Sequence, residues 1–337
     1  MTHRPGRRRI LHRAPFLRAL SAATAALAAT TFIAGCGSGK SSDGASSRAS
    51  SSASGSPAAS FPVTLRAANG KVTIAARPAH IVSLSPTATE DLYAVGAGKQ
   101  VVAVDADSDY PASAPVTSLS GLTPNIEAIA KYSPDLVVAS QDSGGLVDRL
   151  GKLGVPVMIE PAAATIDDAY TQIDRIGRAT GHTAQAEHTV AGMKSRIAAT
   201  LKRAGSHHSG LSYYWELGAS PYYSATSSTF VGRVASLFGL KNVADKADKA
   251  SDGGYPQLSQ EYIVSAKPRL IFLGDSGKSD GGQSPAIVSA RPGWSGIPAV
   301  RSKAVIGLDG DVASRWGPRL PQLVDAIARA VEKAPSR

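Results

Sequence analysis

The feature that most constrains the fold is a pattern of residues that occurs twice in the chain. In the first copy Glu127 lies in a short helical segment, Pro134 follows it, and an apolar run occupies 135–139. The same parts recur 134 residues later, at Glu261, Pro268 and 269–273. Proline disfavours helical geometry in the residue before it, so each helix ends ahead of its proline. Each apolar run is typical of a buried parallel strand, and the repeat predicts two lobes of like architecture.

Further apolar runs alternate with helical segments in both halves. Residues 80–84 read as a strand, and the Ser-Pro-Thr at 85–87 favours a capped helix that ends near Gly96. Other strands are expected at 101–104, 155–159, 211–215 and 304–308, and a helix at 229–238. This alternation predicts an α/β fold with a parallel, doubly wound sheet in each lobe.

A long helix is expected between the two halves. Its apolar residues recur at helical spacing, at Ala186, Val190, Met193, Ile197 and Leu201. About 20 residues at about 1.5 Å each make a rod of about 30 Å. We therefore predict a connecting helix at 183–205; an ordinary surface helix of one lobe is the alternative.

The first residues have the pattern of an export signal. Six arginines and no acidic residue precede an uncharged Ala-, Thr- and Leu-rich run, which ends in small residues before Cys36. This pattern resembles a bacterial lipoprotein signal. We predict a signal peptide at 1–35 and lipidation of Cys36, which would anchor the protein to the extracytoplasmic face of the cell membrane. An uncleaved signal anchor is the alternative, and the choice between general and twin-arginine export stays open.

The remaining chain divides by composition. Residues 36–61 are rich in Ser, Gly and Ala and read as a flexible linker. We expect an N-terminal lobe (N-lobe) at 62–182, the connecting helix at 183–205 and a C-terminal lobe (C-lobe) at 206–337.

Charge and cysteine content exclude two classes of function. The formal charge is +10, but removal of the six signal arginines leaves +4, too little for a nucleic-acid-binding patch. Cys36 is the sole cysteine, so the chain has no internal disulfide and, once lipidated, no catalytic thiol. A monomer is expected.

The order of several short motifs resembles the substrate-binding proteins of ABC importers for cobalamin, haem and ferric siderophores. The resemblance covers about 63–330 and rests on HIVSLSPTATE at 80–90, GAG at 96–98, DYP at 109–111, NIE at 125–127, SPDL at 133–136, YPQLSQE at 255–261 and ASRWGP at 313–318. It implies two Rossmann-like lobes joined by one long helix. It also implies a non-enzymatic protein without a cofactor, which captures a metal chelate between the lobes and delivers it to an ABC permease with its ATPase subunits.

The resemblance also implies a role for the two repeated glutamates. In the family, one glutamate on each lobe docks into arginine pockets of the permease, and by motif these are Glu127 and Glu261. Such charge pairing sets orientation and encounter rate more than affinity. The alternative is that both are first-turn helix glutamates favoured by the helix dipole.

The ligand-binding cleft is expected beyond the carboxyl ends of the strands. The candidates are Ser85, Pro86, Thr87, Asp107, Tyr110, Gln141, Tyr214, Trp215, Glu216, Tyr222, Tyr223, Tyr255, Arg315 and Trp316. Clustered Tyr, Trp and Arg suit a broad ligand that is partly apolar and partly anionic. Core packing is the alternative for some of them, and neighbouring Tyr213 is the expected core residue.

The identity of the ligand stays open. Cobalamin binders of the family present an aromatic residue and a tryptophan at positions that here hold Asp107 and Gly121, although Tyr255 matches an aromatic position. A site for an anionic siderophore would need more basic residues in the cleft than Arg315 alone. As the expected ligand we therefore rank a corrinoid and a ferric siderophore equally, and haem third.

Two rival classes have less support. A bare-metal receptor needs a cluster of histidines and carboxylates, and no histidine falls among the cleft candidates. The segment 96–100 partly resembles a phosphate-binding loop, but it lacks the first glycine and the final Ser or Thr of that motif. The sequence also contains no Gly-x-Ser-x-Gly motif, which would mark a nucleophilic serine. A hydrolase that uses dispersed carboxylates is the remaining enzymatic alternative.

Overall fold

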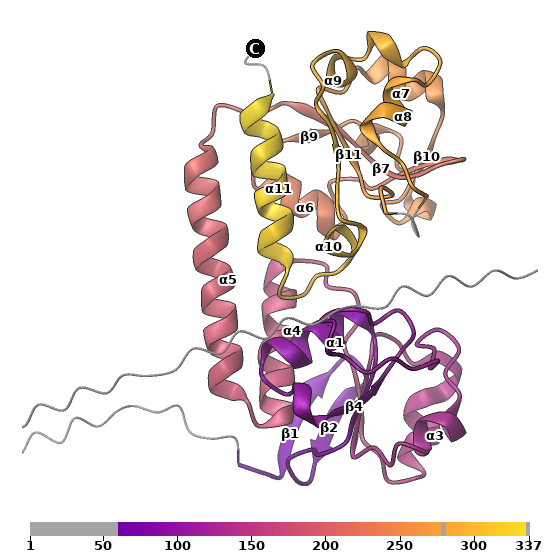
Figure 1. Ribbon diagram of the computed structural model, residues 1–337, viewed down its shortest axis with the longest axis vertical. Helices are drawn as coiled ribbons and strands as arrows, with labels where there is room; N and C mark the ends of the chain where they lie inside the picture. The colour runs from indigo at the N-terminus through magenta and orange to yellow at the C-terminus, as the bar shows by residue number, and fades with distance from the viewer. Residues whose placement is uncertain (1–59, 278–280, 335–337) are drawn as a thin grey trace, which may run out of the picture. The chain divides into compact units, whose positions relative to one another are not determined.

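The computed structural model describes residues 60–277 and 281–334 (Figure 1). The predicted signal peptide at 1–35 and the lipidation of Cys36 lie outside these residues, as does nearly all of the linker at 36–61. In the described part of the chain, no helix is long and apolar enough to cross a membrane.

The N-lobe contains a four-stranded parallel sheet in the order β4-β3-β5-β6. Its strands are β3 (Ile81–Leu84), β4 (Val101–Val104), β5 (Leu136–Ala139) and β6 (Val157–Ile159). Every residue of β3 and β5 is buried, as in parallel sheets covered on both faces. An antiparallel hairpin that the sequence analysis did not predict precedes this sheet, β1 (Val63–Ala67) with β2 (Gly70–Ile74).

Helices of the N-lobe begin at residues suited to capping. They are α1 (Pro86–Ala94), α2 (Ile126–Ala130), α3 (Leu146–Gly151) and α4 (Ile166–Thr180), with short 3₁₀ turns η1 (Gly98–Gln100) and η2 (Ser143–Gly145). Ser85 accepts a hydrogen bond from the backbone N–H of Ala88 and so caps α1, while Pro86 occupies the first turn. The predicted capped helix after β3 is confirmed.

The C-lobe sheet is mixed rather than wholly parallel as predicted. Its order is β10-β8-β7-β11-β12, with β9 beside β7. The strands are β7 (Ser212–Ala219), β8 (Tyr222–Ser224), β9 (Lys241–Asn242), β10 (Gln257–Leu258), β11 (Leu270–Leu273) and β12 (Val305–Gly307). β8 and β10 are antiparallel to their neighbours. A two-residue turn joins β7 to β8, and such a turn permits only antiparallel pairing.

The predicted connecting helix is confirmed as α5 (Thr183–Ala204), which packs against α4 and α11 (Figure 1). Ala186, Val190, Met193 and Ile197 of its apolar stripe are buried. The other helices are α6 (Phe230–Ser236), α7 (Gln260–Ala266), α8 (Pro285–Ser289), α9 (Pro298–Arg301), α10 (Gly310–Ser314) and α11 (Leu320–Lys333), with 3₁₀ turns η3 (Ala244–Lys246), η4 (Ala250–Asp252) and η5 (Trp294–Gly296). The boundaries between the lobes stay a prediction.

The repeated pattern is confirmed in the backbone. Asn125 caps α2, and its counterpart Ser259 caps α7. After these helices, Ser133 and Lys267 both adopt a φ of 48° immediately before proline. Lys267 is the C-cap of α7, whereas α2 ends at Ala130, three residues before Ser133. In both halves the left-handed residue and the proline after it lead the chain from the helix into β5 or β11.

Candidate ligand-binding cleft

A cavity of about 590 Å³ lies at the carboxyl ends of three N-lobe strands, as the fold class predicts. We call it the cleft cavity. Ser85, Pro86 and Thr87 follow β3, Ala106, Asp107 and Asp109 follow β4, Ser140 follows β5, and Asp311, Ser314, Arg315 and Trp316 come from the C-lobe. Six of the residues predicted for ligand binding therefore meet in one cavity, which both lobes line.

A second cavity of about 340 Å³ shares two of these lining residues, Ser314 and Trp316. We call it the side cavity, and its other lining residues are Ala162, Ala163, Ala164, Leu217, Ala225, Ser228, Thr229, Phe230, Val231, Gly253, Tyr255 and Ala313. The indole N–H of Trp316 donates to Gln172 Oε1 at 3.0 Å. Since α4 carries Gln172, this bond ties the C-lobe to the N-lobe and fixes an aromatic surface that faces both cavities.

Arg315 of the C-lobe contacts a group of N-lobe oxygens. Its Nη1 donates to Glu90 Oε1 and to Asp109 Oδ1, each at 3.0 Å. Its Nη2 donates to the carbonyl oxygen of Asp107 at 3.1 Å and lies 2.7 Å from Asp311 Oδ1. Both terminal nitrogens of the guanidinium therefore have two oxygen partners.

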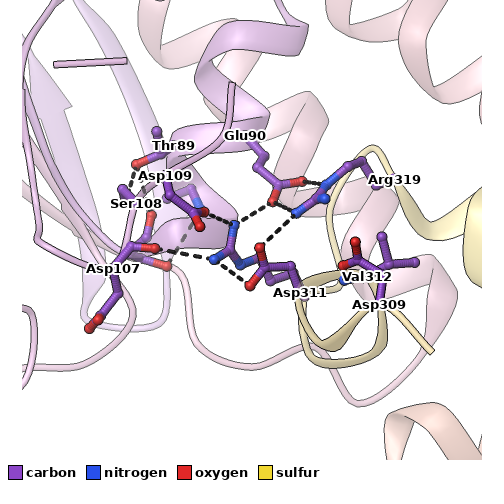
Figure 2. A network of polar contacts seen from close by, with 12 residues as sticks. Thr89, Glu90, Asp107, Ser108, Asp109, Asp309, Asp311, Val312 and Arg319 are labelled. Atoms are coloured by element: carbon purple, nitrogen blue, oxygen red, sulfur yellow. Dashed lines mark hydrogen bonds and ion pairs between the residues drawn. The ribbon is translucent and has the colours of Figure 1, made fainter. Parts of the chain in front are cut away.

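Arg319 pairs with the same buried glutamate. It donates from Nε to Glu90 Oε2 at 2.8 Å and from Nη2 to Oε1 at 2.5 Å, the bidentate geometry that suits a carboxylate (Figure 2). Its guanidinium carbon also lies 4.3 Å from the ring centre of Tyr110. Tyr110 thus packs beside the cleft on an arginine and lines neither cavity.

The local sequence explains the position of the two arginines. Asp309 accepts from the backbone N–H of Val312 and caps α10, a short helix after which Arg315 is the first residue. Arg319 directly precedes α11. Both arginines therefore lie on the connection between α10 and α11, opposite the buried face of α1 that carries Glu90.

Three buried carboxyl groups near the cleft have raised pKa values. Burial raises the pKa of Asp105 to about 6, although the Ser108 hydroxyl, which donates to it, opposes the shift. Burial raises the pKa of Glu160 to about 7, although Arg175 pairs with it. Burial, followed by repulsion from Glu90 and Glu160, raises the pKa of Asp91 well above its usual value. None of these three residues lines the cleft cavity or the side cavity.

The prediction that Tyr214, Trp215 and Glu216 line the cleft is wrong for this structure. All three side chains are fully buried. The predicted strand ended at Trp215, which would place these residues at its exit, but β7 continues to Ala219. They therefore lie within a central strand, where Glu216 forms a bidentate pair with Arg291 at 2.6 and 2.7 Å. Tyr213 is buried, as expected.

Three further candidates line neither cavity. Tyr222 packs against the ring of Trp294 and lies under the Arg291 guanidinium. Gln141 and Tyr223 are exposed. Tyr255 does line the side cavity, and half of its surface is exposed.

Four residues of the cleft network were not predicted: Glu90, Gln172, Asp311 and Arg319. Glu90 had a signal in the sequence, because it is a charged residue within an apolar helical run, where burial requires a partner. Its partner Arg319 lies 229 residues away, and nothing in the sequence around Arg319 indicated this pairing.

Two α/β lobes, one long connecting helix and a cavity lined by both lobes define a two-lobed binding protein for a small solute. A family model described as periplasmic binding protein matches residues 81–312, and the chain belongs to this family.

Known relatives agree with this assignment. The chain is 32% identical over 280 residues to an uncharacterized ABC transporter substrate-binding lipoprotein, YvrC, of Bacillus subtilis strain 168, covering 80% of this chain and 86% of that one. It is 31% identical over 280 residues to a cobalamin-binding protein of Halobacterium salinarum, covering 81% and 75%. A solved structure, a possible iron-binding periplasmic solute-binding protein of Staphylococcus epidermidis, superimposes with a TM-score of 0.65 and 27% identity over 76% of this chain and 99% of that chain.

Proposed function

We propose that this protein is the substrate-binding lipoprotein of an ABC importer, anchored outside the cell membrane through Cys36. It captures a metal chelate, a corrinoid or a ferric siderophore, between its lobes and delivers it to the permease. The observation that carries this proposal is the cleft cavity, where the exits of β3, β4 and β5 meet Arg315 and Trp316 of the C-lobe. The names of the Bacillus and Halobacterium relatives support the importer and the corrinoid respectively.

A corrinoid would be held differently here than in the cobalamin binders that the sequence resembles. Those present a tryptophan near the position of Gly121. A Cβ on Gly121 would lie 2.4 Å from the carbonyl oxygen of Leu84, so a side chain at this position requires the backbone to move. The aromatic surfaces available to a ligand are instead Trp316 and Tyr255.

We also propose that Glu127 and Glu261 are the contacts with the permease. Both side chains are exposed, and each is in the first turn of its helix, two residues after the capping residue. Hydrogen bonds from its own backbone N–H and from Ser259 lower the pKa of Glu261, so this carboxylate is charged at neutral pH. Equivalent carboxylates on two lobes suit a permease made of two similar halves.

The test of the ligand is a titration of the protein that lacks residues 1–36. The panel contains cyanocobalamin, a ferric trihydroxamate, a ferric tris-catecholate and haem, each followed by calorimetry. Saturable binding of one corrinoid or siderophore at micromolar concentration is expected. Absence of binding to every chelate would contradict the proposal and leave the family assignment intact.

A further inference from the structure

The described residues that line the cleft cavity and the side cavity offer a ligand no unpaired positive charge. Among the described residues that line the cleft cavity and the side cavity, Arg315 is the single cation. Its side chain is only 10% exposed, and its terminal nitrogens contact Glu90, Asp109, the Asp107 carbonyl and Asp311. An anionic ligand would have to displace one of these oxygens before it could pair with the guanidinium.

Arg319 is occupied in the same way. Its side chain is 12% exposed, and both of its bonds run to Glu90, whose own side chain is 1% exposed. A ligand carboxylate that replaced Glu90 would leave a buried glutamate without a partner, which is strongly unfavourable. Glu90 is therefore the partner that a ligand cannot displace.

The surface that remains accessible is acidic. Asp109 and Asp311 have side-chain exposures of 66% and 37%, and each pairs with Arg315. The Asp107 side chain is exposed as well and lines the cleft cavity. A ligand that enters this cavity meets carboxylate oxygens before any guanidinium.

We propose that Glu90 sets the charge selectivity of the cleft. By occupying Arg315 and Arg319, it excludes anionic chelates and leaves a cavity for neutral or cationic ones. This inference rests on the proposed function and narrows its ligand to chelates without net negative charge. Glu90 acts through the two arginines and is therefore a positioning residue.

The test uses pairs of ligands that differ mainly in charge. One pair is a ferric trihydroxamate with a terminal ammonium group and its succinylated derivative, which carries a carboxylate instead. The other pair is cobalamin and the derivative in which one side-chain amide is hydrolysed to a carboxylate. Affinities are measured by calorimetry at low and high salt for the wild type, Glu90→Gln and Asp311→Asn.

The wild type is expected to bind the uncharged or cationic member of a pair at least about tenfold more tightly than the anionic member. Glu90→Gln keeps the shape of the side chain but releases the arginines, so it should reduce this ratio at least about fivefold, with an effect that salt weakens. Asp311→Asn should shift the ratio in the same direction. This second variant keeps the test valid if Glu90→Gln, which changes a buried residue, fails to fold. Asp148→Asn removes one exposed carboxylate that lines neither cavity and should leave the ratio unchanged.

A wild type that prefers the anionic members overturns the inference but leaves the importer function standing. The same holds if neither variant changes the ratio while circular dichroism shows both to be folded. Absence of binding to every ligand overturns the proposed function and this inference with it.

Discussion

Arg319 holds Glu90 by two hydrogen bonds, of 2.8 and 2.5 Å, across 229 residues of sequence. The carboxylate lies on α1 of the N-lobe, and the guanidinium lies at the start of α11 in the C-lobe. Since Arg315 shares the same carboxylate at 3.0 Å, one buried glutamate joins the lobes through two cations.

Loss of Arg319 should destabilise the protein. Arg319→Met removes one partner of a nearly buried pair, and such changes cost about 3–5 kcal/mol of unfolding free energy. Arg319→Lys keeps the charge but loses the bidentate geometry, so its cost should be smaller than that of Arg319→Met. Both values are measured by guanidinium chloride unfolding. Exposed Arg301 provides the control, Arg301→Met, which should change stability by less than about 0.5 kcal/mol. Equal effects of Met and Lys at position 319 would contradict this account.

Trp316 should report ligand binding by its fluorescence. Trp215 and Trp294 are fully buried, whereas Trp316 is partly exposed and lines both cavities. We expect a ligand to quench wild-type emission and Trp316→Phe to lose most of this change. The variant keeps an aromatic ring, so calorimetry should show an affinity loss of about tenfold or less. Full quenching in the variant would place the ligand elsewhere.

Reversal of either docking charge should impair transport without affecting capture. Glu127→Lys and Glu261→Lys place a cation where we propose that permease arginines bind, and like charges at an interface cost several kcal/mol. Uptake by cells should fall at least about tenfold, whereas chelate affinity of the purified protein should change less than about twofold. Asp148→Lys, an equal change on the exposed face of α3, should leave uptake normal. Lost affinity with normal uptake would refute the docking role.

Glu160 should make stability depend on pH. Its pKa is about 7 in the folded protein, against 4.5 for an ordinary glutamate. Because the folded pKa is the higher one, the contribution of Glu160 is complete below about pH 4.5 and is lost as the pH rises to about 7. The shift corresponds to about 3 kcal/mol. Glu160→Gln cannot titrate, so its unfolding free energy should fall less steeply than that of the wild type across this range. Parallel pH profiles for the two proteins would exclude Glu160 as the titrating group.

Much of the cleft could be predicted from local sequence. The strand of 81–84 and the cap at Ser85 are both read from neighbouring residues, and in a parallel sheet the residues after the strands share one edge. This reasoning placed Ser85, Thr87 and Asp107 correctly at the cleft cavity. The duplicated helix, proline and strand were equally local signals, and they predicted two α/β lobes but not the antiparallel strands β8 and β10 of the C-lobe.

Tertiary structure decided the rest, because it depends on contacts between distant segments. Pairing with β8 extends β7 to Ala219, so Tyr214 and Trp215 lie within the strand rather than at its end, and both are buried. The charge of the cleft was also decided in this way. The sequence by itself determined the fold class and the strand exits that line the site, since periodicity, caps and prolines act between near neighbours. Only the folded chain determined that Arg315 is already paired, since its partner Glu90 lies 225 residues away and becomes its neighbour only when the two lobes meet.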